Sequence, residues 1–577
     1  MTRSPATRRG NRWGFLATLL SVLAIAGAQA APTAVADTAP VAPVTLTTVS
    51  ADALPTVQIN GVVWDQVIVG NTVYATGEFT KARPAGSAAG TNEVTRTNLL
   101  AYNLTTGALI TTWAPTLNAK GAVIAASTDG KRIFVGGSFT KVSGVNRYRV
   151  VALDASTGAV IPTWNVVVNT RVRALAVSGT TLYMGGIFST VSGQARTRLA
   201  AVSTATGALL AWAPKANAEV LSLAVPAGKG KVVASGKFTT LNTSAAYGMG
   251  AVNATTGAVL AWPINTVVKD AGAESAIYSL STDGTRVYGT GYNFGGGGNF
   301  EGSFAANATD GSIVWINGCL GDTYDSVPIG GVLYNVSHAH NCTPVGANPE
   351  VTPRDYQRAQ AESTTRAASG ANNVGGKFPG RPAPEVLHWL PYLQAGTFTG
   401  SGQGAWTIQG NSTYVTLGGE FTKVNSTAQQ GLVRFAIRSA APNKQGPQGG
   451  SEMTPVLAGA GAGKATVSWK TAWDRDNRRL TYEVLRGASA STAVVVFTMS
   501  RSSAWWSRPT MSFTDTAPAG SAQTYRIRVK DALGNTVTSN PKSGTVPAAA
   551  AAAAAVEPSA SQQSAADTQA RTEEAQR

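Results

Sequence analysis

The chain has few of the side chains that most often carry chemistry. Among its 577 residues are two cysteines and three histidines, and only 13% of the residues are charged. No HExxH or Cys-x2-Cys pattern is present, which excludes the commonest zinc-site signatures. No run of four or more basic residues occurs, which argues against nucleic-acid binding. The sequence therefore predicts a structural framework more clearly than a reaction.

Long apolar runs are also scarce, and the one that stands out lies at the N-terminus. After residue 30 no segment has 18 consecutive apolar residues, so none has the length of a membrane-spanning helix. Residues 1–30 read as a signal peptide, with arginines, an apolar run and the small residues Ala28-Gln29-Ala30 at the cleavage point. We therefore expect a secreted, extracellular protein. Ordinary secretion is favoured over twin-arginine export, because the residues after Arg8-Arg9 do not complete that signal.

Acidic residues are outnumbered, since 46 Lys and Arg face 30 Asp and Glu, for a net charge of +16. Without the four arginines of the signal peptide the mature chain keeps a charge of +12. Such a surface would be attracted to acidic cell-wall polymers or other polyanions.

A repeat of about 50 residues organises the chain from residue 54 to residue 440. Residues 123–214 contain two copies, each with four short apolar or alternating runs separated by turns rich in Gly, which indicates four antiparallel strands. The tryptophan that ends each copy recurs at nearly constant spacing, at positions Trp113, Trp164, Trp212 and Trp262. A period of this size with four strands predicts the blade of a β-propeller.

Seven such units predict an all-β fold, a seven-bladed β-propeller followed by an immunoglobulin-like β-sandwich. Unit six, from Asp325 to about Leu393, departs most from the pattern, so six or eight blades stay open as alternatives. Unit seven lacks a fourth strand. Residues 56–63 would supply it and close the ring without an unpaired edge.

The repeated residues predict structural roles. Paired glycines in GGSF, GGIF and GGEF mark close backbone approach inside a strand. The Phe after them and the Trp of each last strand are expected to pack one blade against its neighbour. The GGxFTxVxG…R…ATG…W pattern recurs in at least five units over residues 56–438 and resembles the delta-60 family of bacterial repeat propellers. This resemblance implies a propeller fold and implies no reaction.

Composition changes after a linker at residues 441–452. Residues 453–546 contain about seven short strands without cysteine, which is typical of an immunoglobulin-like sandwich. The arrangement resembles a fibronectin type III module, and that likeness implies core positions for Trp469 and Tyr525. Two further segments are expected to lack fixed structure, the linker 31–53 and the Ala-rich tail 547–577.

Unusual residues gather at the junction of units five and six, residues 317–342, which holds both cysteines and two of the three histidines. In a meander blade the two loops that carry Cys319 and Cys342 lie on the same face of the ring. Together with export, this predicts a disulfide between them, which would contribute about 3 kcal/mol.

Several ionisable residues are expected at the same face. His338 and His340 are two apart on a strand and should point to one side, and His388 should approach them. Asp322 and Asp325 lie nearby. Such groups can bind a divalent metal or act as general acid and base. The alternative, in which the imidazoles only hydrogen-bond loop carbonyls, is favoured because an H-x-H pair alone is common.

Two function classes remain. One is a secreted or surface-associated, monomeric binding protein whose propeller presents a loop face to an extracellular polysaccharide, a cell-wall polymer or a surface protein. The other is an extracellular carbohydrate-active enzyme, a glycosidase or lyase, with Asp322 and Asp325 as candidate carboxylates. The second rests on analogy from fold, so binding is favoured. The sequence requires no cofactor, although a divalent metal at His338 and His340 is one option.

Overall fold

A computed structural model describes residues 46–548, and this part of the protein is all-β. Its only helical segments are three short 3-10 turns, at Pro263–Thr266, Thr343–Val345 and Gly450–Met453. Within the described residues no helix is long and apolar enough to cross a membrane. The signal peptide predicted for residues 1–30 lies outside the described residues, as do most of the predicted linker and tail.

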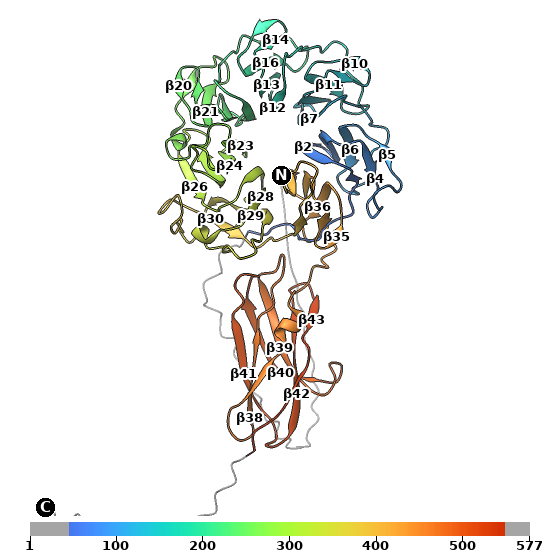
Figure 1. Ribbon diagram of the computed structural model, residues 1–577, viewed down its shortest axis with the longest axis vertical. Helices are drawn as coiled ribbons and strands as arrows, with labels where there is room; N and C mark the ends of the chain where they lie inside the picture. The colour runs from blue at the N-terminus through green and yellow to red at the C-terminus, as the bar shows by residue number, and fades with distance from the viewer. Residues whose placement is uncertain (1–45, 549–577) are drawn as a thin grey trace, which may run out of the picture. The chain divides into compact units, whose positions relative to one another are not determined.

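Seven antiparallel sheets of three or four strands follow one another along the chain (Figure 1), and we number them one to seven. Their strands are, in order, β2 (Val62–Val69), β3 (Thr72–Glu78) and β6 (Leu99–Asn103); β7 (Gly121–Ala126), β8 (Arg132–Gly137) and β11 (Val150–Asp154); β12 (Val172–Ser178), β13 (Thr181–Gly186) and β16 (Leu199–Ser203); β17 (Val220–Ala224), β18 (Lys231–Gly236), β21 (Met249–Asn253) and β22 (Val259–Leu260); β23 (Ser275–Thr282), β24 (Arg286–Asn293), β25 (Gly302–Asn307) and β26 (Ile313–Asn317); β27 (Thr323–Ile329), β28 (Val332–Ala339), β29 (Gln357–Arg366) and β30 (Pro384–Leu387); β32 (Ala405–Gly410), β33 (Tyr414–Gly419) and β36 (Leu432–Ala436).

In sheets one to four and in sheet seven, the loop between the second and third strands carries a small ladder of its own. These involve β1 (Gln58–Ile59), β4 (Lys81–Arg83) and β5 (Val94–Thr95); β9 (Lys141–Val142) and β10 (Val145–Asn146); β14 (Thr190–Val191) and β15 (Gln194–Ala195); β19 (Thr240–Leu241) and β20 (Ser244–Ala245); β31 (Leu393–Gln394), β34 (Lys423–Val424) and β35 (Thr427–Ala428).

The first strands of successive sheets contact one another in order, and β32 of sheet seven contacts β2 of sheet one, so these contacts form a closed cycle. Figure 1 shows the sheets following one another around a common centre. The glycines predicted to allow close approach lie at these junctions. A Cβ on Gly136 would come within 2.8 Å of Val172 in the next sheet, and a Cβ on Gly418 within 2.7 Å of Val63.

The tryptophans anchor each sheet to the next, as predicted. Trp212 is almost fully buried, packs at 5.0 Å against Tyr183 of sheet three, and donates from Nε1 to the carbonyl of Asn253 in sheet four at 2.9 Å. Trp164 does the same one unit earlier, where its Nε1 bonds the carbonyl of Ser203 at 3.0 Å. A buried ring whose N–H is hydrogen-bonded holds two sheets together through apolar burial and through a directional hydrogen bond.

Two expectations about the strands need correction. The fourth strand is regular in sheets four to six only, and in sheets one to three it shrinks to a single bridge, such as Tyr102 with Leu109. The segment that borders β36 is residues 50–54, whose amides of Ser50 and Leu54 donate to Ala436 and Arg434. Residues 62 and 63, predicted to close sheet seven, instead belong to β2, because their apolar side chains are buried in the junction with that sheet.

The flanks of the seven sheets are also more ordered than expected. Val49 and Ala51, inside the predicted flexible linker, are buried, and the amide of Val49 donates to the Tyr334 hydroxyl at 2.9 Å. In the second predicted linker, the amides of Lys444 and Gln445 donate to Asp52. Apolar burial and these hydrogen bonds fix both segments.

The C-terminal residues form two antiparallel sheets that share one core. Trp469 and Tyr525 are buried in that core, as expected, and the Tyr525 hydroxyl donates to Asp515 at 2.8 Å. The eight strands, one more than expected, are β37 (Val456–Gly459), β38 (Lys464–Lys470) and β41 (Thr510–Thr516) in one sheet and β39 (Arg479–Arg486), β40 (Val494–Ser502), β42 (Ala522–Lys530), β43 (Thr536–Thr538) and β44 (Lys542–Thr545) in the other.

Candidate functional site

A β-bulge interrupts the first strand of every one of the seven sheets. In each case one residue is skipped in the pairing with the second strand, and a bulge of this kind re-aims a side chain. We call the seven skipped residues the bulge ring: Trp64, Ala122, Arg173, Leu221, Tyr278, Tyr324 and Trp406. The first strands contact one another in a cycle, so the bulge ring repeats around the common centre of the sheets.

Six of the seven bulge-ring residues line a single cavity of about 600 Å³. This volume is in the usual range for small-molecule sites, roughly 300 to 1,000 Å³. The rim includes Phe294, whose side chain is 63% exposed, so the cavity reaches the surface. A second cavity of about 310 Å³ adjoins it along the first strands and shares the same six bulge-ring residues with it.

One side of the larger cavity is aromatic. Ring centroids are separated by 5.4 Å between Tyr278 and Tyr324, by 4.5 Å between Tyr324 and Trp406, and by 4.9 Å between Trp406 and Trp64. We call these four bulge-ring residues, from sheets five, six, seven and one, the aromatic arc. Tyr324 and Trp406 are almost fully buried, while Trp64 and Tyr278 keep accessible surface. Such a wall suits a ligand with an apolar face.

The other side is positively charged. Four basic residues from sheets two, three and four line this side, and we call them the basic arc: Lys120, Arg171, Arg173 and Lys237. Glu219 lies between two of them, 2.7 Å from Arg171 and 3.8 Å from Lys237. Lys120 Nζ lies 3.4 Å from the centroid of the Trp64 ring, in a cation-π contact. Burial, aided by the charge of Arg173, lowers the pKa of Lys120 to about 8.

A polar network supports the aromatic arc from behind. Gln403 donates from Nε2 to the Tyr324 hydroxyl at 2.7 Å and contacts His338 Nδ1 at 2.6 Å. The Tyr324 hydroxyl donates to Asp322 at 3.0 Å, and His338 Nε2 lies 3.6 Å from the same oxygen. Burial raises the pKa of Asp322, while His338 opposes the shift. The predicted residues His338 and Asp322 therefore meet at the cavity, with His338 in its wall and Asp322 buried beneath it.

Asp325 lies apart from Asp322, in the wall of the smaller cavity together with Asp65. Asp325 accepts from the amide of Ile408 at 2.9 Å, and Asp65 accepts from the amide of Ile124 at 2.8 Å, each in the next sheet. Burial raises the pKa of Asp325 to about 6, and burial together with the charge of Asp325 raises that of Asp65 to about 7. Their hydrogen bonds to the backbone tie neighbouring sheets and indicate structural roles.

The predicted convergence of three imidazoles is wrong. His338 and His340 both contact the ring of Tyr356, with centroids 5.6 and 6.1 Å away, but His340 lies outside the cavity lining and faces Glu350 at 3.6 Å. His388 is directed elsewhere: its Nε2 donates to the carbonyl of Asp474 at 2.8 Å, and burial lowers its pKa to about 4. The end of the short strand β30 turns His388 away from the other two.

No group of three or more His, Cys, Asp or Glu side chains within residues 46–548 is arranged to hold a metal ion. His338 has one carboxylate neighbour, Asp322, and His340 has another, Glu350. The two histidines therefore do not share a set of ligands.

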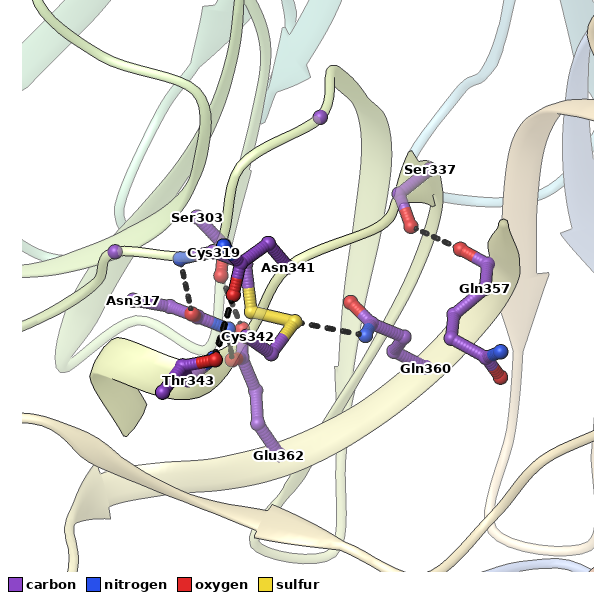
Figure 2. The surroundings of a disulfide bond; sticks show 12 residues. Ser303, Asn317, Cys319, Ser337, Asn341, Cys342, Thr343, Gln357, Gln360 and Glu362 are labelled. Carbon is purple, nitrogen blue, oxygen red and sulfur yellow. Dashed lines mark hydrogen bonds between the residues drawn. A yellow bond between two sulfur atoms is a disulfide. The ribbon is translucent and has the colours of Figure 1, made fainter. Parts of the chain in front are cut away.

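The predicted disulfide is confirmed. Cys319 and Cys342 are bonded across a sequence separation of 23 residues, and both are buried. Figure 2 shows the bond beside Gln360, whose side-chain amide contacts Cys342 Sγ at 3.5 Å. The bond joins the loop that enters sheet six to the loop after β28, the strand that carries His338.

A buried carboxylate reinforces the same junction. Glu362, from β29, accepts hydrogen bonds from Ser303 and from Asn317 of sheet five, the latter at 2.6 Å (Figure 2). It also accepts from Asn335 at 3.3 Å. Burial raises the pKa of Glu362 to about 7. Sheets five and six are thus linked by polar contacts as well as by the disulfide.

Sequence reasoning found His338 and Asp322 but missed most of the cavity. The missed residues are the aromatic and basic arcs and Gln403. The sequence did contain a signal for the cavity, because the bulge ring occupies one equivalent position in every repeat and that position holds an aromatic residue in four of the seven repeats. It was hidden because the position varies between Trp, Tyr, Arg, Leu and Ala, so no motif marks it.

Comparison of the chain with protein-family models and with curated proteins found no match. The inferences about function therefore rest on the geometry.

Proposed function

We propose that this is a secreted glycan-binding protein of the delta-60 type, in which a seven-bladed β-propeller binds a carbohydrate in the cavity lined by the bulge ring. A fibronectin type III module follows the propeller and acts as a spacer.

The propeller assignment is supported by the cycle of contacts between first strands and by the meander order within each sheet. Arg434 supports closure of the ring as well. This buried side chain of β36 donates to the carbonyls of Leu104 and Thr105 in sheet one and of Pro55, at 2.5 to 2.8 Å.

One observation carries the glycan proposal, namely an open cavity that combines aromatic rings with many hydrogen-bonding side chains. The C–H face of a sugar ring is weakly positive and packs on the negative face of an aromatic ring. Tyr278 and Phe294 offer accessible aromatic surface, while Gln403, His338 and the basic arc can bond hydroxyl groups at the ring edge. Pockets of this mixed kind give both affinity and orientation.

Catalysis by Asp322 and Asp325 is less well supported. A glycosidase needs two carboxylates on either side of the scissile bond, whereas Asp322 is buried against Tyr324 and Asp325 bonds the backbone of the next sheet. Neither lines the larger cavity.

The proposal is tested by applying the full mature chain to an array of cell-wall and plant polysaccharides, followed by titration calorimetry with the best oligosaccharide. We expect Tyr278→Ala and Phe294→Ala each to weaken binding about tenfold. Tyr247→Ala is the matched control, since Tyr247 is 46% exposed and lies outside the cavity lining.

Equal affinities in all four proteins would exclude the cavity as the binding site. Absence of binding to every polysaccharide on the array would overturn the glycan proposal.

A further inference from the structure

We infer that the ligand of this cavity is an acidic polysaccharide, a uronate-type chain whose carboxylate binds between Lys120 and Arg173. The inference rests on the proposed glycan site and adds the chemical class of its ligand.

The charges of the lining favour an anion. Four basic side chains line the cavity against two acidic ones, Glu219 and Glu274. Glu219 is already engaged by Arg171 and Lys237. Across residues 46–548, no carboxylate lies within 4 Å of the charged groups of Lys120 or Arg173, so neither of these two cations forms a salt bridge.

Both of these cations lie against the aromatic arc. Lys120 Nζ is over the ring of Trp64, and the Arg173 guanidinium is 5.9 Å from the ring centroid of Tyr278, whose hydroxyl it contacts at 3.4 Å. They therefore flank the surface on which a sugar ring would stack. A carboxylate on that sugar would meet two charged donors in a partly buried setting, where charge-assisted bonds are strongest.

The two cations also repel each other. Burial and then the charge of Arg173 lower the pKa of Lys120, to about 8. An anion placed between them would remove this repulsion, whereas a neutral sugar would not. Preference for an acidic ligand thus follows from charge placement rather than from the overall basic charge of the chain.

The experiment compares two forms of one polymer. Oligogalacturonate and its fully methyl-esterified form offer the same ring faces, but only the first carries carboxylates. Binding of each is measured by calorimetry with the full mature chain and with Lys120→Gln, Arg173→Gln and the double variant. Lys229→Gln, an exposed hairpin lysine outside the lining, is the control for loss of general positive charge.

We expect the acidic form to bind roughly 10- to 100-fold more tightly than the ester. The preference should fall roughly 3- to 10-fold in each single variant, vanish in the double variant and persist in the control. It should also weaken as salt is raised, because ionic contacts are screened. Circular dichroism and the melting temperature show that each variant is folded.

The outcomes separate the two proposals. If both forms bind equally and Tyr278→Ala weakens both, the glycan site stands and the acidic-ligand inference fails. If the acidic form is preferred but Lys229→Gln lowers that preference as much as Lys120→Gln does, the attraction is a nonspecific effect of positive charge and the inference fails. If neither form binds and the array is also negative, both proposals fall.

Discussion

The aromatic arc and the basic arc face the same cavity, but only the aromatic arc draws on sheets that depart from the repeat. The basic arc lies on sheets two to four, which keep the repeat pattern with little change. The aromatic arc includes sheets five and six, which depart from it, together with the regular sheets seven and one. Comparison of the two arcs shows that a sheet does not need an altered loop to contribute to the site. The bulged position or a residue next to a regular strand is sufficient, as Arg173 and Lys120 show.

The two arcs also differ in what stabilises them. Regular sheets are held by buried anchors such as Phe188 and Trp212. Sheets five and six have lost the repeated loop and are held by the Cys319–Cys342 bond and the Glu362 network. Because the divergent sheets carry Tyr324 and His338, the aromatic arc and its hydrogen bonds with Gln403 depend on these additional links.

The largest effect is expected when the junction between sheets seven and one is opened, since both arcs need the cycle to remain closed. Arg434→Met removes a buried side chain that donates to three carbonyls across this junction, and it should lower the free energy of unfolding by about 4 kcal/mol. Denaturant unfolding of both proteins measures this difference. Arg366→Met, at an exposed arginine, is the control and should change stability by less than about 0.5 kcal/mol. Similar losses in both variants would contradict the role assigned to Arg434.

The second-largest effect should show that the divergent sheets behind the aromatic arc and the regular sheets behind the basic arc are stabilised differently. Replacing both cysteines, in Cys319→Ala/Cys342→Ala, is expected to cost about 3 kcal/mol through the loss of loop constraint. Hydrogen exchange should rise in residues 317–342 and change little in residues 181–203 of sheet three. Uniformly faster exchange in both regions would mean that the bond stabilises the whole molecule rather than its divergent side.

A smaller effect concerns pH. The pKa of Asp65 is about 7 in the folded protein against an ordinary value of 3.8, so between about pH 4 and 7 the folded state binds its proton more tightly than the unfolded state. Its contribution to stability is therefore greatest at low pH, falls as pH rises through this window, and is constant above it.

In Asp65→Asn this contribution is absent. Between pH 8 and pH 5 the melting temperature of Asp65→Asn should therefore rise about 3 °C less than that of the parent protein. Asp129→Asn, in an exposed turn, is the control. An unchanged difference between the two pH values in Asp65→Asn would show that this carboxyl does not titrate as the geometry implies.

The smallest effect distinguishes the two histidines of the H-x-H pair. His338→Ala removes a cavity wall residue and a partner of Gln403, and should weaken glycan binding about fivefold. His340→Ala should leave affinity unchanged, because His340 lies outside the lining. Calorimetry on the two single variants checks this, and equal losses would mean that the pair acts as a unit.

Much of the framework was predictable because it depends on local patterns. Even in the divergent sixth unit, local pattern marks the runs VLYNVSHAH and YQRAQAEST as strands, and they form β28 and β29. The close approach at Gly136 and the anchoring role of Trp212 also followed from the repeat. Assignment to the delta-60 family, secretion and carbohydrate binding stay predictions.

The sequence by itself determined most of the strands, the period and the pairing of Cys319 with Cys342, since these depend on alternation, turn residues and loops that are brought to one face by the meander. Only the tertiary structure decided which residues meet. Trp64 and Trp406 are 342 positions apart and touch because the first and last sheets are neighbours. The bulges depend on strand register, which no single repeat reveals. Nor does the sequence reveal that His388, at the end of β30, is directed away from the cavity toward the carbonyl of Asp474.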